Sequence, residues 1–274
     1  MHRHSDNPPV VVGIDGSEAA VDAALWSVDE AIRRDAPLRL ICVVDDERLP
    51  GTVHSDTQID NEFAERALHR AVEAIAATGK PVSADPVVRR GHSAAALIAE
   101  SRDAALVCVG STGIDWVAGK VLGSTAQAVA EHAHCPVAVV RHGDSVAADR
   151  NGGVIVVGFR RAQRDDAVFR AALDEARNRH AALIAVGVWQ DDFGKTPYTE
   201  LEQCVALWTQ RYPDVHVYPV PTLADLPRFL ADNADGQIQL AVLGADEADK
   251  VTTIVGPQSY SPLPHGRCSV LVVR

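Results

Sequence analysis

The sequence lacks the features that would place the protein in a membrane or on nucleic acid. It has no run of about 18 apolar residues, the length that a membrane-spanning helix needs. Residues 1–9 are short and polar, without the apolar core of a signal peptide. The net charge is −11 and no basic run offsets it, which argues against a nucleic-acid partner. We therefore expect a cytoplasmic protein with neither a membrane nor a nucleic-acid partner.

Cysteine is scarce, with five widely spaced residues and no CxxC pair. This pattern argues against a disulfide framework and against a zinc ribbon, and we expect mostly buried thiols. His132, His134 and Cys135 crowd together just before an apolar run, but His265 and Cys268 precede the last apolar run in the same way. The repetition favours a structural role over a metal site, so no metal ligands are predicted.

Motifs of known catalytic sites are also missing. The sequence has no G-x-S-x-G nucleophile elbow, and no pair of catalytic carboxylates can be placed. The run from Gly113 to Lys120 differs from a Walker loop, because its glycines are one residue too far apart and Val121 stands where Ser or Thr would bind magnesium. No residue stands out as a general base for attack on a phosphate. We therefore expect a protein that is not an enzyme.

Short apolar runs alternate with helical patterns through the first half of the chain. The runs at residues 10–14, 38–44, 82–88, 105–109 and 137–140 predict buried strands. Helical spacing predicts helices over residues 21–32, 68–75, 93–101 and 125–132, with Ser93 as the cap of the third, and the polar segment 45–59 reads as a loop. This alternation predicts a parallel, doubly wound sheet.

The pattern then repeats. Residues 142–153 have the composition of a linker. The strand and helix after residue 154 repeat those at the start, and HGRCSVLVVR at residues 265–274 repeats HAHCPVAVVR at residues 132–141. Such self-similarity indicates a tandem pair. We expect an α/β protein with domains at residues 1–141 and 154–274, each a five-stranded parallel sheet flanked by four helices.

A glycine-rich stretch follows the strand predicted at residues 105–109. It contains Gly110 and Gly113, then Gly123, and finally Ser124 and Thr125 at the start of a helix. Glycines allow a ligand to approach the backbone, and the hydroxyl and N–H groups at a helix start attract an anion. The stretch therefore predicts a phosphate site, although Gly110 and Gly123 could also serve only as turns.

The first strand ends just before Asp15, and the ends of parallel strands can open on one crevice. Asp15 is therefore a candidate for the same site. A structural alternative stays open, in which Asp15 caps the following helix, a role that Ser17 could share.

Three stretches together resemble the universal stress protein family: VVVGIDGS at residues 10–17, the spacing of Gly110, Gly113, Gly123 and Ser124, and HAHCPVAVVR at residues 132–141. The resemblance implies two Rossmann-like domains of the adenine nucleotide α-hydrolase-like kind. It implies a stress-response regulator that binds ATP, with or without magnesium, in its N-terminal domain and turns over little or none. Two alternatives stay open, a nucleotide-independent scaffold for dimerisation and partner binding, and a weak adenine-nucleotide hydrolase.

The resemblance also assigns roles along the first site. Gly13 and Asp15 would line the adenosine end and Val43 would meet the adenine. The ribose and phosphates would follow Gly110, Ser111, Thr112 and Gly113, and the phosphate tail would reach Gly123, Ser124 and Thr125. Members of the family pair through their fifth strand, so we expect either a homodimer or an intramolecular pseudo-dimer, with an unidentified protein partner.

The second half departs from this pattern. Arg160 replaces the acid, Glu247 stands at the second glycine, and Gly256 is followed by Pro257 rather than serine. A carboxylate repels a phosphate and proline removes an N–H group. We therefore expect the second domain to bind nucleotide weakly or not at all.

Overall fold

The computed structural model describes residues 7–45, 55–113, 122–142, 153–159, 167–188, 195–233, 238–255 and 268–274. The chain divides into two compact units, Met1–Ser145 and Val146–Arg274, and the division falls inside the segment predicted as a linker. Among the described residues, none of the helices combines the length and the hydrophobicity that a membrane span requires.

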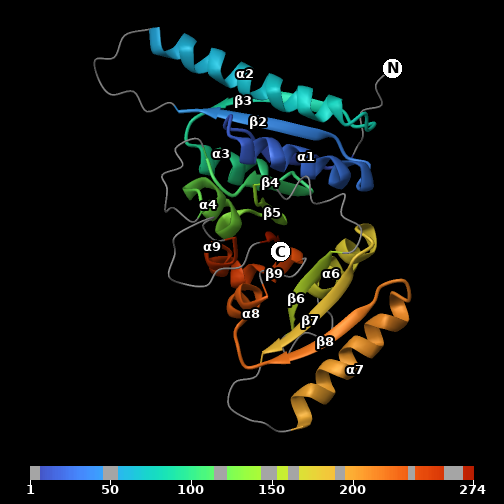
Figure 1. The fold of residues 1–274 in the computed structure, drawn as a ribbon. Helices are drawn as coiled ribbons and strands as arrows, with labels where there is room; N and C mark the ends of the chain where they lie inside the picture. Colours follow the sequence, from blue (N-terminus) through green and yellow to red (C-terminus); the bar gives the residue numbers. More distant parts are fainter. Residues whose placement is uncertain are drawn as a thin grey trace. The chain divides into compact units, whose positions relative to one another are not determined.

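The first unit alternates strands and helices in chain order (Figure 1). Its elements are β1 (Val10–Gly13), α1 (Glu18–Arg33), β2 (Leu38–Val44), α2 (Ser55–Ala77), β3 (Ala84–Arg90), α3 (Ser93–Glu100), β4 (Leu106–Gly110), α4 (Ser124–His132) and β5 (Val137–Val140). Within this unit the strand order is β3-β2-β1-β4-β5, and neighbouring strands run parallel. The predicted α/β fold is confirmed.

The reversal of strand order between β1 and β4 positions the site. Right-handed crossovers that step in opposite directions place their helices on opposite faces of the sheet. The helices α1 and α2 precede the reversal and pack together, whereas α3 and α4 follow it and pack together. A crevice opens where the order reverses, beyond the carboxyl ends of the strands. The inner strands β1 and β4 are almost wholly buried, whereas the edge strand β3 is mostly exposed, as expected for a sheet covered on both faces.

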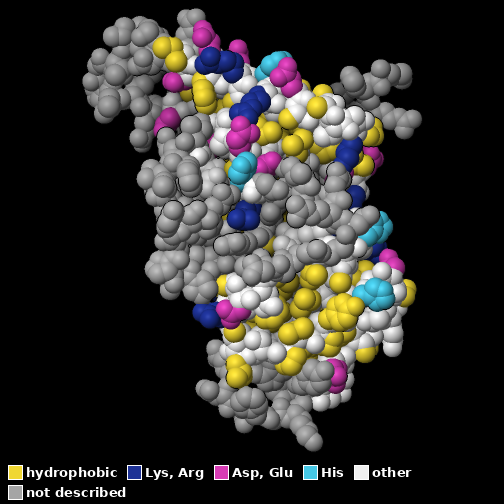
Figure 2. Space-filling model, viewed as in Figure 1, with side chains coloured by type: hydrophobic (Ala, Val, Ile, Leu, Met, Phe, Trp, Pro, Cys, Tyr) yellow, Lys and Arg dark blue, Asp and Glu magenta, His cyan; other side chains and the backbone are white. Residues whose placement is uncertain are grey.

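The second unit repeats this arrangement. Its elements are β6 (Val154–Phe159), α6 (Ala167–Asn178), β7 (Ala182–Val188), α7 (Lys195–Arg211), β8 (Val217–Thr222), α8 (Leu226–Asp232), β9 (Ile238–Gly244), the 3₁₀ helix η1 (Ala245–Lys250), α9 (Val251–Val255) and β10 (Ser269–Val273). The strand order in this unit is β10-β9-β6-β7-β8, again parallel. In Figure 2, hydrophobic side chains gather over β6 and β7, and charged side chains of both signs lie along α2.

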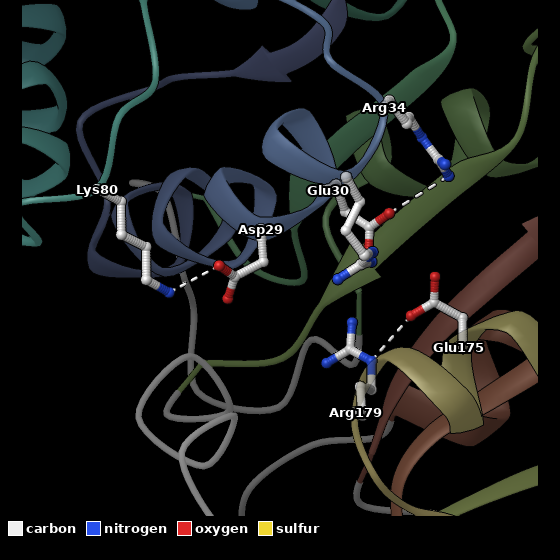
Figure 3. Close-up of polar contacts among 7 residues, drawn as sticks. Asp29, Glu30, Arg34, Lys80, Glu175 and Arg179 are labelled. Carbon is white, nitrogen blue, oxygen red and sulfur yellow. Dashed lines mark hydrogen bonds and ion pairs between the residues drawn. The ribbon is translucent and has the colours of Figure 1, made fainter. Parts of the chain in front are cut away.

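The repeat extends to a buried ion pair at the end of the first helix of each unit (Figure 3). In α1 a guanidinium nitrogen of Arg34 lies 3.3 Å from Glu30, and in α6 one of Arg179 lies 2.8 Å from Glu175. The residue that follows each arginine has a positive φ, 48° at Asp35 and 49° at His180. Both helices therefore end in the same left-handed turn.

Two boundaries and one cap illustrate how the structure differs from the sequence predictions. The segment predicted as a loop becomes helical at Ser55. The sequence did not reveal this helix start, because the first turn of α2 is polar and carries no apolar periodicity. The third strand begins at Ala84, because its parallel register with β2 pairs Leu38 with Ala84. Ser93 does not cap α3, since His92 occupies the cap position and makes no side-chain capping bond.

Candidate functional site

A cavity of about 490 Å³ lies at the carboxyl ends of β1, β2 and β4. Its walls include every predicted site residue except Ser111, namely Gly13, Asp15, Val43, Gly110, Thr112, Gly113, Gly123, Ser124 and Thr125. The volume falls within the range of small-molecule sites in proteins. The fold thus brings these residues together, and their binding role stays a prediction.

The turn after β1 is built by Asp15 and Ser17. Oδ1 of Asp15 accepts a hydrogen bond from the Ser17 N–H at 2.9 Å, and Oγ of Ser17 accepts one from the Ala20 N–H at 3.1 Å. Ser17 is therefore the N-cap of α1, whereas Asp15 holds the turn that precedes it. Because Asp15 also lines the cavity, its structural role does not remove it from the site.

Ser111 links two other parts of the site through its backbone. Its N–H donates to the Val140 carbonyl at 2.9 Å, and its carbonyl accepts from the Gly123 N–H at 2.9 Å. The side chain is buried, with 3% of the residue exposed. Ser111 therefore connects the end of β4 to β5 and to the start of α4, instead of lining the cavity.

The N-terminus of α4 faces the cavity. Gly123 is its N-cap in an extended conformation and makes no side-chain capping bond, and Ser124, Thr125 and Ala126 in the first turn line the cavity. The first N–H groups of a helix have no partner within the helix and carry a partial positive charge. This end of the cavity is therefore suited to an anion.

Gly110 and Gly123, at the two ends of the predicted phosphate site, differ in whether packing requires a glycine. A Cβ atom at Gly110 would lie 2.6 Å from the backbone carbon of Ala19, so the close approach of β4 to α1 requires glycine. Among the described residues, the atom nearest to a Cβ atom at Gly123 would be the Ser111 carbonyl oxygen at 3.7 Å. Packing explains Gly110, and it does not require a glycine at position 123.

Sequence reasoning missed several cavity residues. The polar and aromatic ones are Cys42, Asp45, Asp60, Phe63 and Ser93. Asp45 directly follows β2, so the rule that ligands bind beyond strand ends could have identified it. Asp60 and Phe63 gave no such signal, because Asp60 lies just beyond the segment read as a loop and Phe63 lies ahead of the predicted start of the helix.

Burial, and secondarily the carboxylate of Asp15, raise the pKa of the Cys42 thiol to about 11. The thiol is therefore protonated at neutral pH and acts as an apolar wall of the cavity. Four of the five cysteines are buried and Cys204 is half-buried, in agreement with the prediction of mostly buried thiols.

The chain after the corresponding strand of the second unit has a different structure. After β9 the chain forms η1, in which Glu247 is buried and pairs with Lys250 at 2.7 Å. Its carboxylate is thus paired with a cation of the same unit, and weak or absent nucleotide binding by this unit stays a prediction. The predictions that rest on Arg160, Gly256 and Pro257 lie outside the described residues.

The chain matches the Universal stress protein family over residues 7–141. It is 45% identical over 266 residues to Universal stress protein Rv2624c of Mycobacterium tuberculosis H37Rv, covering 97% of this chain and 96% of that protein. The chain belongs to the universal stress protein family. It is also similar to Universal stress protein Rv3134c of the same organism, at 39% identity over 274 residues, with 97% and 95% covered.

A solved universal stress protein from Archaeoglobus fulgidus has the same fold, with a TM-score of 0.71, 16% identity and coverage of 97% and 96% of the two chains. The family model matches within the first unit, whereas the two relatives and this solved structure match over both units. The family resemblance predicted from the sequence, including its tandem form, is therefore confirmed.

Proposed function

We propose that the first unit binds ATP, with or without magnesium, in the cavity beyond β1, β2 and β4, and that the protein acts as a regulator in the stress response. The observation that carries the proposal is the placement of the uncapped N-terminus of α4 and the glycines of the β4 loop on one cavity with Asp15 and Val43. Glycines admit a phosphate chain and the helix start stabilises its charge, by about 1 kcal/mol for an exposed anion.

We propose little or no turnover. The carboxylates that line the cavity in the described part of the chain are Asp15, Asp45 and Asp60. Asp45 follows β2 and Asp60 belongs to α2, on the far side of β1 from the predicted phosphate end in the strand order. Asp15 holds the turn before α1. None of them forms a carboxylate pair at the phosphate end that could activate water.

In this proposal the second unit has a structural role and does not contribute a nucleotide site. Where the first unit has a glycine loop, the second has η1 with the buried Glu247 and Lys250 pair. We therefore expect about one nucleotide per chain. A cytoplasmic location, and assembly as a homodimer or pseudo-dimer, stay predictions from the sequence.

Thermal unfolding with and without ATP and magnesium, after removal and identification of any retained nucleotide, tests the proposal. A ligand at about 100 times its Kd stabilises the folded state by about 2.7 kcal/mol, which shifts Tm by several degrees. A shift with about one adenine nucleotide per chain supports ATP binding. No shift and no released nucleotide would favour the nucleotide-independent scaffold.

A further inference from the structure

The two ends of the cavity differ in chemistry. Toward β4 and α4 it is lined by glycine and hydroxyl groups, represented by Gly113 and Ser124. Toward β2 and α2 it is lined by Asp45, Asp60 and Phe63. The strand order places β1 between these ends. Two carboxylates disfavour an anion at the second end, so a ligand with one anionic end would direct its uncharged end toward α2.

Among the described residues, Phe63 is the aromatic side chain that lines the α2 end of the cavity. The buried face of α2 consists of smaller residues such as Ala64, Ala67 and Leu68, whereas 41% of Phe63 is exposed. A phenylalanine usually buries its ring, and this one lines the cavity instead of the core. Part of the ring is therefore available to a ligand.

The ring has a neighbour in the turn after β1. Gly16 has φ +88°, and a Cβ atom there would lie 2.9 Å from Cζ and 3.6 Å from Cε1 of Phe63. The edge of the ring is thus in contact with the backbone of the turn that contains Asp15. Any side chain at position 16 would both strain the backbone and displace the ring.

Arg70 holds this part of α2 against the same turn. Its guanidinium donates to the Gly16 carbonyl at 3.4 Å and forms an ion pair with Glu18 at the start of α1. Arg70 follows Phe63 by two helical turns, so both side chains project from one face of α2. The ring is therefore positioned before any ligand enters, which reduces the entropy lost on binding.

We propose that Phe63 contacts the planar face of the nucleobase, and that this contact makes the cavity select a nucleotide over a phosphate chain alone. The inference rests on the proposed ATP site and names a residue that determines its specificity. A ring stacked on a base contributes about 1 to 3 kcal/mol, whereas a phosphate chain without a base has no planar face to stack on the ring.

The test uses the full-length chain, stripped of nucleotide, and measures the Kd of ATP and of tripolyphosphate by calorimetry. Phe63→Ala should weaken ATP binding about tenfold and leave tripolyphosphate binding unchanged. Phe63→Tyr, which keeps the ring, should retain the affinity of the original protein for ATP. Ile59→Ala is the matched control, because Ile59 lies one turn earlier on α2, is 59% exposed and is not part of the cavity wall.

The outcomes separate this inference from the function on which it rests. Equal ATP affinity in Phe63→Ala and the original protein would overturn the role of Phe63 and leave the ATP site intact. Equal weakening of ATP and tripolyphosphate would also overturn it, because Phe63 would then shape the cavity and not contact the base. Failure of the original protein to bind ATP would overturn both proposals.

Discussion

Gly113 lies directly opposite the carboxylate of Asp15: a Cβ atom at position 113 would stand 2.9 Å from Oδ2. The two residues belong to the segments that follow β4 and β1, and both line the cavity. A glycine at position 113 therefore leaves the space that the Asp15 carboxylate occupies. The acid and the glycine therefore lie next to each other on the wall of the cavity.

Gly113→Ala tests this relationship. The added methyl group must displace the Asp15 carboxylate, which can move because it is the end of a side chain, so stability should fall by less than about 1 kcal/mol. ATP affinity should fall about tenfold, because the cavity wall is moved. A double-mutant cycle with Asp15→Ala checks the cause by calorimetry. Strictly additive effects would show that the two residues act independently.

Gly110 and Gly123 should separate folding from binding. Gly110→Ala places a methyl group against the Ala19 backbone and should lower the free energy of unfolding by about 1 to 3 kcal/mol or more. Gly123→Ala has room and should cost about 1 kcal/mol or less, yet it should weaken ATP binding. Urea unfolding and calorimetry on both variants measure these effects.

The control for Gly123 is the same change at Gly256, its counterpart by sequence in the second half, which should leave nucleotide binding unchanged. Similar losses of ATP affinity at both positions would contradict the functional asymmetry of the two units.

The buried Glu30 should contribute more to stability than its exposed neighbour Asp29. The side chain of Glu30 is 1% exposed and pairs with Arg33 and Arg34, whereas Asp29 and Lys80 form an exposed pair (Figure 3). Glu30→Gln should lower the free energy of unfolding by about 1 to 3 kcal/mol. Asp29→Asn should change it by less than about 1 kcal/mol.

Urea unfolding of the two variants side by side gives both values. Equal losses would mean that the burial of Glu30 adds nothing to the strength of its ion pairs.

The raised pKa of Cys42 predicts that the free energy of unfolding depends on pH in the alkaline range. Because its pKa in the folded chain is raised to about 11 and an unfolded thiol has a pKa of about 8.5 to 9, the folded state holds the proton when the unfolded state has lost it. The contribution of this group to the free energy of unfolding is therefore fully present below about pH 8. It falls by about 2 kcal/mol as the pH rises from about 9 to about 11.

Unfolding by urea across this pH range checks the effect, with Cys42→Ala as the comparison. The slope of stability against pH should be smaller in the variant, and an unchanged slope would assign the effect to other groups.

The sequence by itself determined the strand and helix alternation, the repeat and the family. Buried parallel strands must be apolar runs of limited length, so β2 and β5 could be placed from their residues alone. The glycines and hydroxyl groups of the β4 loop were equally visible, because their conformational and hydrogen-bonding properties are local.

Tertiary structure decided what depends on neighbours distant in sequence. The start of β3 follows its register with β2, and the need for glycine at position 110 follows the approach of Ala19. Ser111 was assigned to the site from its position in the loop, yet its side chain is buried. Phe63 reached the cavity only because α2 packs against the turn at Gly16. Each of these contacts joins segments far apart in the chain, and no local pattern encodes them.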